Sequence, residues 1–143
     1  METYRTKGAE VVLVAMGSMA GTIKDVVDRL RSEGTSVGLV KIRCYRPFPH
    51  EDLWEAIKGA RVVAVMEADF SMGSEGAVGM DLKAKVCGRP DAPLVLDFIT
   101  GLGGREVNQE IIEGVVAEAQ KAMINKSTFV ESCWMGLDPT IVP

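Results

Sequence analysis

Four short apolar runs, each followed by a segment of helical periodicity, are the feature that most constrains the fold. The runs span residues 10–16, 35–42, 61–67 and 93–99. The first and the third, EVVLVAM and RVVAVME, are apolar almost throughout, which is typical of strands that are covered on both faces. We therefore interpret the four runs as strands of a sheet that lies between two layers.

The segments between the runs carry apolar residues at helical spacing. Pro49 suits the first position of a helix, and Asn108 is a suitable N-cap for the last helix. Val107 and Ile112 flank that cap at the spacing of a hydrophobic staple. The expected apolar faces are Ile23, Val26, Val27 and Leu30, then Leu53, Trp54 and Ile57, then Val78, Leu82 and Val86, and finally Ile111, Val115, Val116 and Ala119.

This alternation of strands and helices predicts an α/β fold. Strands that alternate with helices form a three-layer α/β/α sandwich around an open, mostly parallel sheet. The length of 143 residues fits one core, and the sequence after residue 126 has no periodicity. We therefore expect a single α/β domain at residues 1–126 and an irregular C-terminal tail at residues 127–143.

The loops that follow the strands hold the unusual chemistry of this chain. In a parallel sheet these loops all emerge at the carboxyl edge, so we expect the candidates for function to gather on one rim. The four loops are GSMAG (17–21), CYRPFP (44–49), ADFSMGSEG (68–76) and TGLGGRE (100–106).

The turn after the second run is stiffened by two prolines and carries arginines and aromatic rings. Proline fixes the backbone and lowers the entropy that is lost on ordering. Aromatic rings and guanidinium groups on a rigid protrusion are typical of anchors at protein interfaces. This composition favours an interface over catalysis, and the candidate residues are Arg43, Tyr45, Arg46 and Phe48, together with Arg105 on the last loop.

Two glycine-containing loops are candidates for an anion site. Gly17 and Ser18 stand between a strand and a helix, where backbone amides can bind an anion. Gly103 and Gly104 could form a similar nest of amides. The alternative is that Gly17 turns the chain and Ser18 caps the helix, while the second glycine pair forms a tight turn; both interpretations stay open.

Acidic residues near the same edge are the candidates for acid–base chemistry. Glu67 and Asp69 follow the third run, and Asp97 lies within the fourth. A carboxyl group needs burial or a like-charged neighbour to titrate near neutral pH. We expect ordinary solvated carboxylates, and we assign no catalytic residue.

Composition excludes several classes of protein. A net charge of −4 gives no general attraction to nucleic acid or to an anionic membrane, no apolar run approaches the roughly 20 residues of a membrane span, and the first ten residues are too polar for a secretory signal. We therefore expect a cytoplasmic protein. Cys44, Cys87 and Cys133 are far apart, and His50 is the sole histidine, so we expect no disulfide framework and no metal or iron–sulfur site held by this chain alone.

Four stretches resemble the second core domain of the pyruvate:ferredoxin oxidoreductase family. The turn in VGLVKIRCYRPFPHEDL is similar to the R-x-x-R-P-F-P turn of that domain, and FITGLGGREV is similar to its GLGGR-D-V stretch, with Glu106 where aspartate is usual. AEVVLVAMGSMAGTIKDVVDRLRSEG and VVAVMEADFSMGSEGAVGMDL match in order and spacing. The resemblance covers about residues 8–122.

The resemblance implies a fold like the C-terminal domain of transketolase. It also implies a parent enzyme that uses thiamine diphosphate, magnesium and iron–sulfur clusters to convert pyruvate and coenzyme A to acetyl-CoA, with ferredoxin as electron acceptor. This chain lacks the G-D-G…N-N signature for the cofactor, the cysteine-rich ferredoxin segment and the preceding α-subunit domain. We therefore expect the C-terminal part of an α subunit that binds no cofactor and catalyses nothing alone, with other domains or subunits of the complex as its partners.

Two other functions remain open from the sequence. The chain could be a free-standing module that binds an anion or a nucleotide through the two glycine loops. It could also be the corresponding domain of another thiamine diphosphate enzyme, such as a transketolase or the β subunit of a 2-oxoacid dehydrogenase. The GLGGR stretch argues against this last alternative.

Overall fold

The computed structural model describes residues 1–126, 131–137 and 140. Its strands are β1 (Glu2–Tyr4), β2 (Val11–Met16), β3 (Val37–Ile42), β4 (Val62–Glu67), β5 (Leu94–Ile99) and β6 (Cys133–Trp134). Its helices are α1 (Met19–Ser32), α2 (His50–Ile57), α3 (Ala77–Val86) and α4 (Gln109–Ile124), with a short 3-10 helix at Leu102–Gly104. Each strand and helix expected from the sequence has a counterpart among them.

The strands form one six-stranded sheet in the order β1-β3-β2-β4-β5-β6. The sheet is parallel from β3 through β2, β4 and β5 to β6. Only the pair of β1 and β3 is antiparallel among the described strands. The open, mostly parallel sheet expected from the sequence is therefore confirmed.

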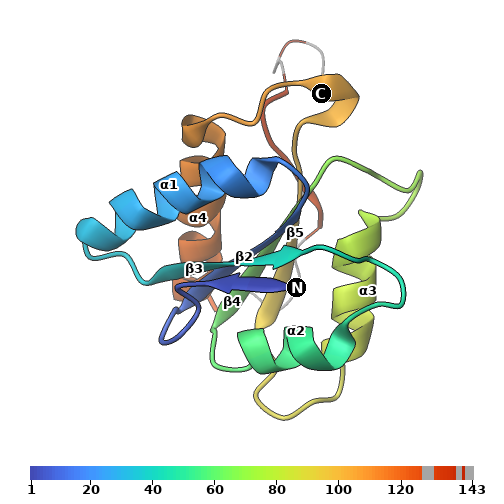
Figure 1. Ribbon diagram of the computed structural model, residues 1–143. Helices are drawn as coiled ribbons and strands as arrows, with labels where there is room; N and C mark the ends of the chain where they lie inside the picture. The colour runs from blue at the N-terminus through green and yellow to red at the C-terminus, as the bar shows by residue number, and fades with distance from the viewer. Residues whose placement is uncertain (127–130, 138–139, 141–143) are drawn as a thin grey trace.

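The helices cover both faces of this sheet. α1 and α4 lie on one face, and α2 and α3 lie on the other (Figure 1). Along β2, Val11 and Leu13 pack into the core beneath α1 and α4, whereas Val12 and Val14 pack into the core beneath α2 and α3. Successive side chains of a strand point to opposite faces, so a strand between two helical layers is apolar at almost every position. The three-layer α/β sandwich is thus confirmed.

Two strands have no counterpart in the sequence prediction. β1 and β6 span three and two residues, which is too short for a recognisable apolar pattern. β6 lies within the expected irregular tail (127–143) and pairs with Phe98 and Ile99 of β5. Residues 127–130, 138–139 and 141–143 of that tail lie outside the described residues, and the domain boundary at residue 126 stays a prediction.

The helix ends agree only in part with the sequence. Asn108 Oδ1 accepts a hydrogen bond from Ile111 N at 3.0 Å, so the predicted cap of α4 is confirmed. Pro49 precedes α2 by one residue instead of starting it. Ser18 precedes α1, but its side chain accepts no helix N–H because its backbone is already helical (φ −73°, ψ −28°). The alternative in which the Ser18 side chain caps α1 is therefore wrong. The described helices include none with the length and apolar character of a membrane span.

Candidate functional site at the carboxyl edge of the sheet

The four loops singled out in the sequence lie at one edge of the sheet. β2, β3, β4 and β5 are parallel, so their carboxyl ends share that edge. In Figure 1 the chain leaves β2, β4 and β5 toward the top of the view and β3 toward the right. The topology thus places the candidate residues on a common rim.

A pocket of about 450 Å³ joins the two glycine loops. Its lining includes Ser18 at the start of α1, and Gly104 and Arg105 after β5. Gly104 has a φ of +82°, a left-handed conformation that glycine adopts without strain. We call this the Ser18–Arg105 pocket. Gly103 is not among its lining residues, and Gly17 lines a neighbouring pocket of about 290 Å³ instead.

The charges around the Ser18–Arg105 pocket are mixed. Arg105 and Glu106 both line it, so a cation and a carboxylate face the same space. Arg105 Nη1 donates a hydrogen bond to Gly136 O at 3.2 Å, which connects the last loop to the segment after β6. The pocket therefore combines backbone amides and one guanidinium group with a competing negative charge.

Glu67, at the end of β4, is a structural partner of α3. It is 5% exposed, so the expectation of a solvated carboxylate is wrong. Its Oε2 accepts a hydrogen bond from Val78 N and its Oε1 accepts one from Gly79 N, both at 2.8 Å. These N–H groups in the first turn of a helix have no partner within the helix, and the carboxyl group supplies one.

Asp97 and Asp69 complete this arrangement. Asp97 is buried, again contrary to the expectation, and its Oδ2 accepts hydrogen bonds from Gly76 N at 2.9 Å and from the Ser132 hydroxyl at 2.8 Å. Asp69 is exposed, as expected, and its Oδ2 accepts one from Ala77 N at 3.2 Å. The amide end of α3 is thus occupied by the protein's own carboxyl groups, whose negative charge suits the positive end of the helix dipole.

Two glycines make this close approach possible. A Cβ on Gly76 would lie 2.2 Å from Glu67 Cδ, and a Cβ on Gly79 would lie 2.9 Å from Asp97 Cγ. A side chain at either position would therefore displace a buried carboxyl group. Glycines three residues apart at a helix start, after a strand that ends in glutamate, are the sequence signal that could have revealed this contact.

Burial raises the pKa of Glu67 to about 8. The hydrogen bonds from Val78 and Gly79 act in the opposite direction, whereas hydrogen bonds with the Asp69 and Asp97 side chains raise the pKa further. Asp97 Oδ1 is buried and receives no N–H or O–H from the residues that the structure describes. A pKa of about 8 lets Glu67 keep its proton at neutral pH, so that its carboxyl group can act as a donor as well as an acceptor.

Residues 43–49, between β3 and α2, form the turn that we call the arginine turn. Its side chains form hydrogen bonds and ion pairs with other elements of the protein. Arg46 Nη1 donates to Asp81 Oδ2 at 2.8 Å, and the Tyr45 hydroxyl donates to the same oxygen at 2.5 Å. The hydrogen bonds from Tyr45 and Arg46 lower the pKa of Asp81. The Arg46 guanidinium also lies 4.0 Å from the centre of the Tyr45 ring, a cation–π contact.

The other members of the turn are anchored in the same way. Arg43 Nη2 pairs with Glu2 Oε2 at 2.7 Å, which connects the turn to β1. Phe48 packs edge-on against Tyr45 with ring centres 5.8 Å apart, and both rings contact the core beneath α2 and α3. The turn therefore holds one shape, with the side chains of Arg43 and Arg46 65% and 60% exposed.

The remaining candidates do not form a further site. Cys44 and Cys87 are exposed, Cys133 is half-buried and all three are free thiols. His50 is exposed at the start of α2. Within residues 1–126, 131–137 and 140, His, Cys, Asp and Glu side chains nowhere form a group of three that could hold a metal ion.

Curated proteins similar to this chain are subunits of oxidoreductases. The pyruvate synthase subunit PorA of Pyrococcus abyssi is 44% identical over 96% of this chain and 35% of its own length. The PorA subunit of Methanocaldococcus jannaschii is 40% identical over 96% and 33%. The ketoisovalerate oxidoreductase subunit VorA of Pyrococcus furiosus is 36% identical over 96% and 35%. The chain thus spans about a third of the length of these relatives.

A solved structure and a family model agree with these relatives. The 2-oxoglutarate:ferredoxin oxidoreductase from Magnetococcus marinus, with 2-oxoglutarate, coenzyme A and succinyl-CoA bound, superposes with a TM-score of 0.60. The match has 25% identity and covers 78% of this chain and 18% of that one. The model of pyruvate:ferredoxin oxidoreductase core domain II matches residues 9–112. The resemblance seen in the sequence is confirmed, and the chain belongs to the family of pyruvate:ferredoxin oxidoreductase core domain II.

Proposed function

We propose that this chain is the C-terminal assembly domain of the α subunit of a 2-oxoacid:ferredoxin oxidoreductase. The parent enzyme is cytoplasmic, oxidatively decarboxylates pyruvate to acetyl-CoA with thiamine diphosphate, and passes electrons through iron–sulfur clusters to ferredoxin. The observation that carries this proposal is the similarity to PorA subunits over 96% of the chain. The choice of pyruvate follows the same relatives.

The chain's own residues support a noncatalytic role for this domain. Glu67, Asp69 and Asp97 lie where an acid or base would stand, yet each accepts a hydrogen bond from the start of α3. The described carboxylates therefore do not fit the magnesium and diphosphate of thiamine diphosphate, and three dispersed cysteines do not fit an iron–sulfur cluster. We assign these groups, and the contacts to coenzyme A and ferredoxin, to other parts of the complex.

The surface proposed for assembly is the arginine turn together with Arg105. Tyr45 and Phe48 fix the turn on the core, while Arg43 and Arg46 extend into solvent. A preorganised surface loses little conformational entropy when it binds, and arginine is suited to carboxylates of a partner. These properties support contact with a neighbouring domain or subunit.

The test is to express the chain with the remaining parts of its oxidoreductase and to measure their association. We expect the wild-type chain to copurify with them and Arg46→Ala to raise the dissociation constant at least tenfold. Arg61→Ala is the matched control. Like Arg46, Arg61 is exposed and paired with a carboxylate, in this case that of Glu10, but it precedes β4 and so lies at the opposite edge of the sheet. Similar unfolding curves for both variants will show that the loss is not a loss of folding.

Two results would contradict the proposal. Turnover of pyruvate by the purified chain alone would show that catalysis is contained within it. Tight binding of thiamine diphosphate by the lone chain, measured by calorimetry, would place the cofactor on residues that we describe as structural.

A second candidate function is favoured by the Ser18–Arg105 pocket. It brings the start of α1, the glycine turn and one arginine into one space of about 450 Å³, as an anion-binding module requires. Phosphate, nucleotides and coenzyme A should then raise the melting temperature of the chain. We expect no rise, because Glu106 lines the same pocket, and a rise that Arg105→Ala abolishes would instead establish the binding module.

A further inference from the structure

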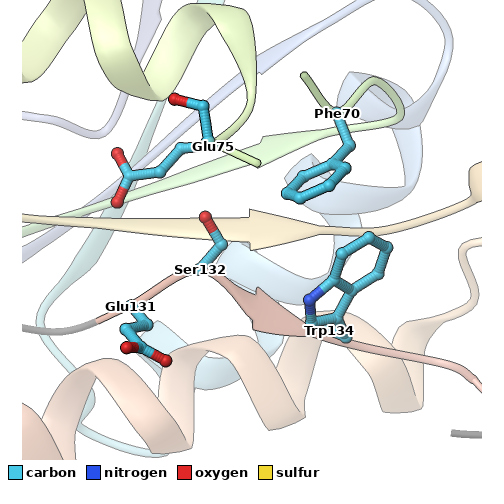
Figure 2. A pocket seen from close by; sticks show the side chains of 6 residues that line it. Phe70, Glu75, Glu131, Ser132 and Trp134 are labelled. Atoms are coloured by element: carbon cyan, nitrogen blue, oxygen red, sulfur yellow. The ribbon is translucent and has the colours of Figure 1, made fainter. Parts of the chain in front are cut away.

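A pocket of about 360 Å³ opens between the β4–α3 loop and the edge strand β6. Its lining residues are Phe70, Ser74, Glu75, Glu131, Ser132 and Trp134. Figure 2 shows the two rings on one side of the pocket and the two carboxylates on the other. We call it the Trp134 pocket; it shares no residue with the Ser18–Arg105 pocket or with the arginine turn.

One wall of the Trp134 pocket is aromatic and open to solvent. The ring centres of Phe70 and Trp134 lie 4.6 Å apart with an angle of 58° between the rings. Trp134 is 39% exposed, and Met72 on the same loop as Phe70 is 96% exposed. Among the residues that the structure describes, β6 is the last strand of the sheet, and no described strand pairs with its outer edge, which offers a neighbouring molecule access to these rings.

The carboxylates of the opposite wall are not fully neutralised. Glu75 Oε1 pairs with Lys83 Nζ at 2.5 Å, and both side chains are less than one-third exposed. The side chain of Glu131 is exposed and forms no ion pair with the residues that the structure describes. Two carboxylates and one ammonium group leave a net negative charge beside the aromatic wall.

The serine hydroxyls of the pocket already use their protons within the chain. Ser132 Oγ donates to Asp97 Oδ2 at 2.8 Å, and Ser74 Oγ donates to Met80 Sδ at 2.9 Å. The lone pairs of both oxygens remain as acceptors. The polar side chains of this pocket therefore offer acceptors and negative charge to an occupant.

We propose that the Trp134 pocket binds an arginine side chain of a neighbouring protein chain. The aliphatic stem and the flat guanidinium group of arginine pack against aromatic faces, and its donors match the Glu131 carboxylate and the serine oxygens. Arginine joins a cation to a planar face, which matches a pocket that has rings on one side and carboxylates on the other. As a subunit contact, this inference rests on the proposed function; the pocket's preference for arginine can be tested separately.

The first experiment measures that preference on the chain itself. The probe is N-acetyl-arginine amide, and N-acetyl-citrulline amide is the uncharged control of the same shape. In a Trp54→Phe background, Trp134 is the sole tryptophan, and its indole N–H resonance reports occupancy. We expect the arginine probe to shift this resonance and the citrulline probe to bind at least fivefold more weakly.

Substitutions at the pocket sharpen this experiment. Glu131→Gln should weaken the binding of the arginine probe at least threefold. Glu110→Gln should leave it unchanged, because Glu110 is exposed in the first turn of α4, outside the pocket. Equal binding of the arginine and citrulline probes, or no shift of the Trp134 resonance at saturating probe, would overturn the assignment.

The second experiment measures assembly with the other parts of the oxidoreductase. We expect Glu131→Lys, which reverses the charge of the pocket, to weaken association at least tenfold relative to Glu110→Lys. If the wild-type chain fails to assemble, the proposed function is wrong, and the probe titration still decides whether the pocket binds arginine. If the wild type assembles and Glu131→Lys assembles equally well, the pocket is not a subunit contact and this inference is wrong.

Discussion

Gly76 and Gly79, at the start of α3, have no side chain and so leave room for the buried carboxyl groups of Glu67 and Asp97. Gly79 and Gly21 both lie inside helices, but a Cβ on Gly79 would lie 2.9 Å from Asp97 Oδ1, whereas a Cβ on Gly21 has no atom within 4 Å. We expect Gly79→Ala to lower the free energy of unfolding by about 1–3 kcal/mol, a typical penalty for overpacking. Gly21→Ala should raise it by roughly 0.5–1 kcal/mol through helix propensity. Urea unfolding measures both, and stabilisation by both changes would refute the steric argument.

Glu67 makes the stability of the protein depend on pH. Its pKa is raised from an ordinary value of 4.5 to about 8, so between these values the folded protein holds a proton that the unfolded chain has released. The contribution of Glu67 to the free energy of unfolding is therefore fully present below about pH 4.5 and is lost as pH rises to about 8. The slope of this loss is at most about 1.4 kcal/mol per pH unit.

Glu67→Gln tests this dependence because glutamine cannot ionise. At low pH the variant is expected to be less stable than the wild type. The wild-type carboxyl group accepts hydrogen bonds from two backbone N–H groups, whereas the side-chain NH2 of glutamine cannot accept one and would face one of them. Its free energy of unfolding should fall less than that of the wild type across the same pH range. Urea unfolding at pH 5, 6, 7 and 8 gives both slopes, and parallel curves would exclude a buried proton on Glu67.

At the scale of elements, the sequence predicted what depends on continuous patterns. The four buried strands could be recognised because helices cover both faces, which makes nearly every position apolar. β1 and β6 could not, because two or three residues at the edge of a sheet carry no period. The last helix was recognisable down to its Asn108 cap, since the cap and the Ile111 N–H group that donates to it are three residues apart.

The site was less predictable because its partners come from distant elements. Glu67 accepts a hydrogen bond from an amide 11 residues ahead of it, and Asp97 accepts one from an amide 21 residues before it. The glutamate and the two glycines are visible in the sequence, but the contact between them depends on how the fold brings β4, α3 and β5 together. Likewise, the arginine turn was recognised as rigid and exposed, but its ion pairs reach 41 residues to Glu2 and 35 to Asp81. Local composition reveals the type of loop, while the fold supplies its partners.

Across the whole molecule, the segment after α4 returns to the sheet. β6 extends the sheet beside β5, and Met135 N donates to Ile99 O at 3.0 Å. Cys133 and Met135 pack against the core beneath α1 and α4. Residues 131–137 therefore belong to the packed structure, although they follow the last helix and show no periodicity.

A chain that ends at residue 126 is expected to fold with a less stable sheet. The truncation removes the β6 strand from the edge of β5 and takes the Ser132 hydroxyl from Asp97, a buried group that needs its donors. We expect a loss of roughly 2–4 kcal/mol in the free energy of unfolding, from at least three hydrogen bonds between the segment and the rest of the protein and from its apolar contacts. Ser132→Ala in the full chain isolates the hydrogen bond and should cost about 1–2 kcal/mol. If the truncated chain unfolds at the same urea concentration as the full chain, β6 adds nothing to the cooperative unit and the boundary at residue 126 is correct.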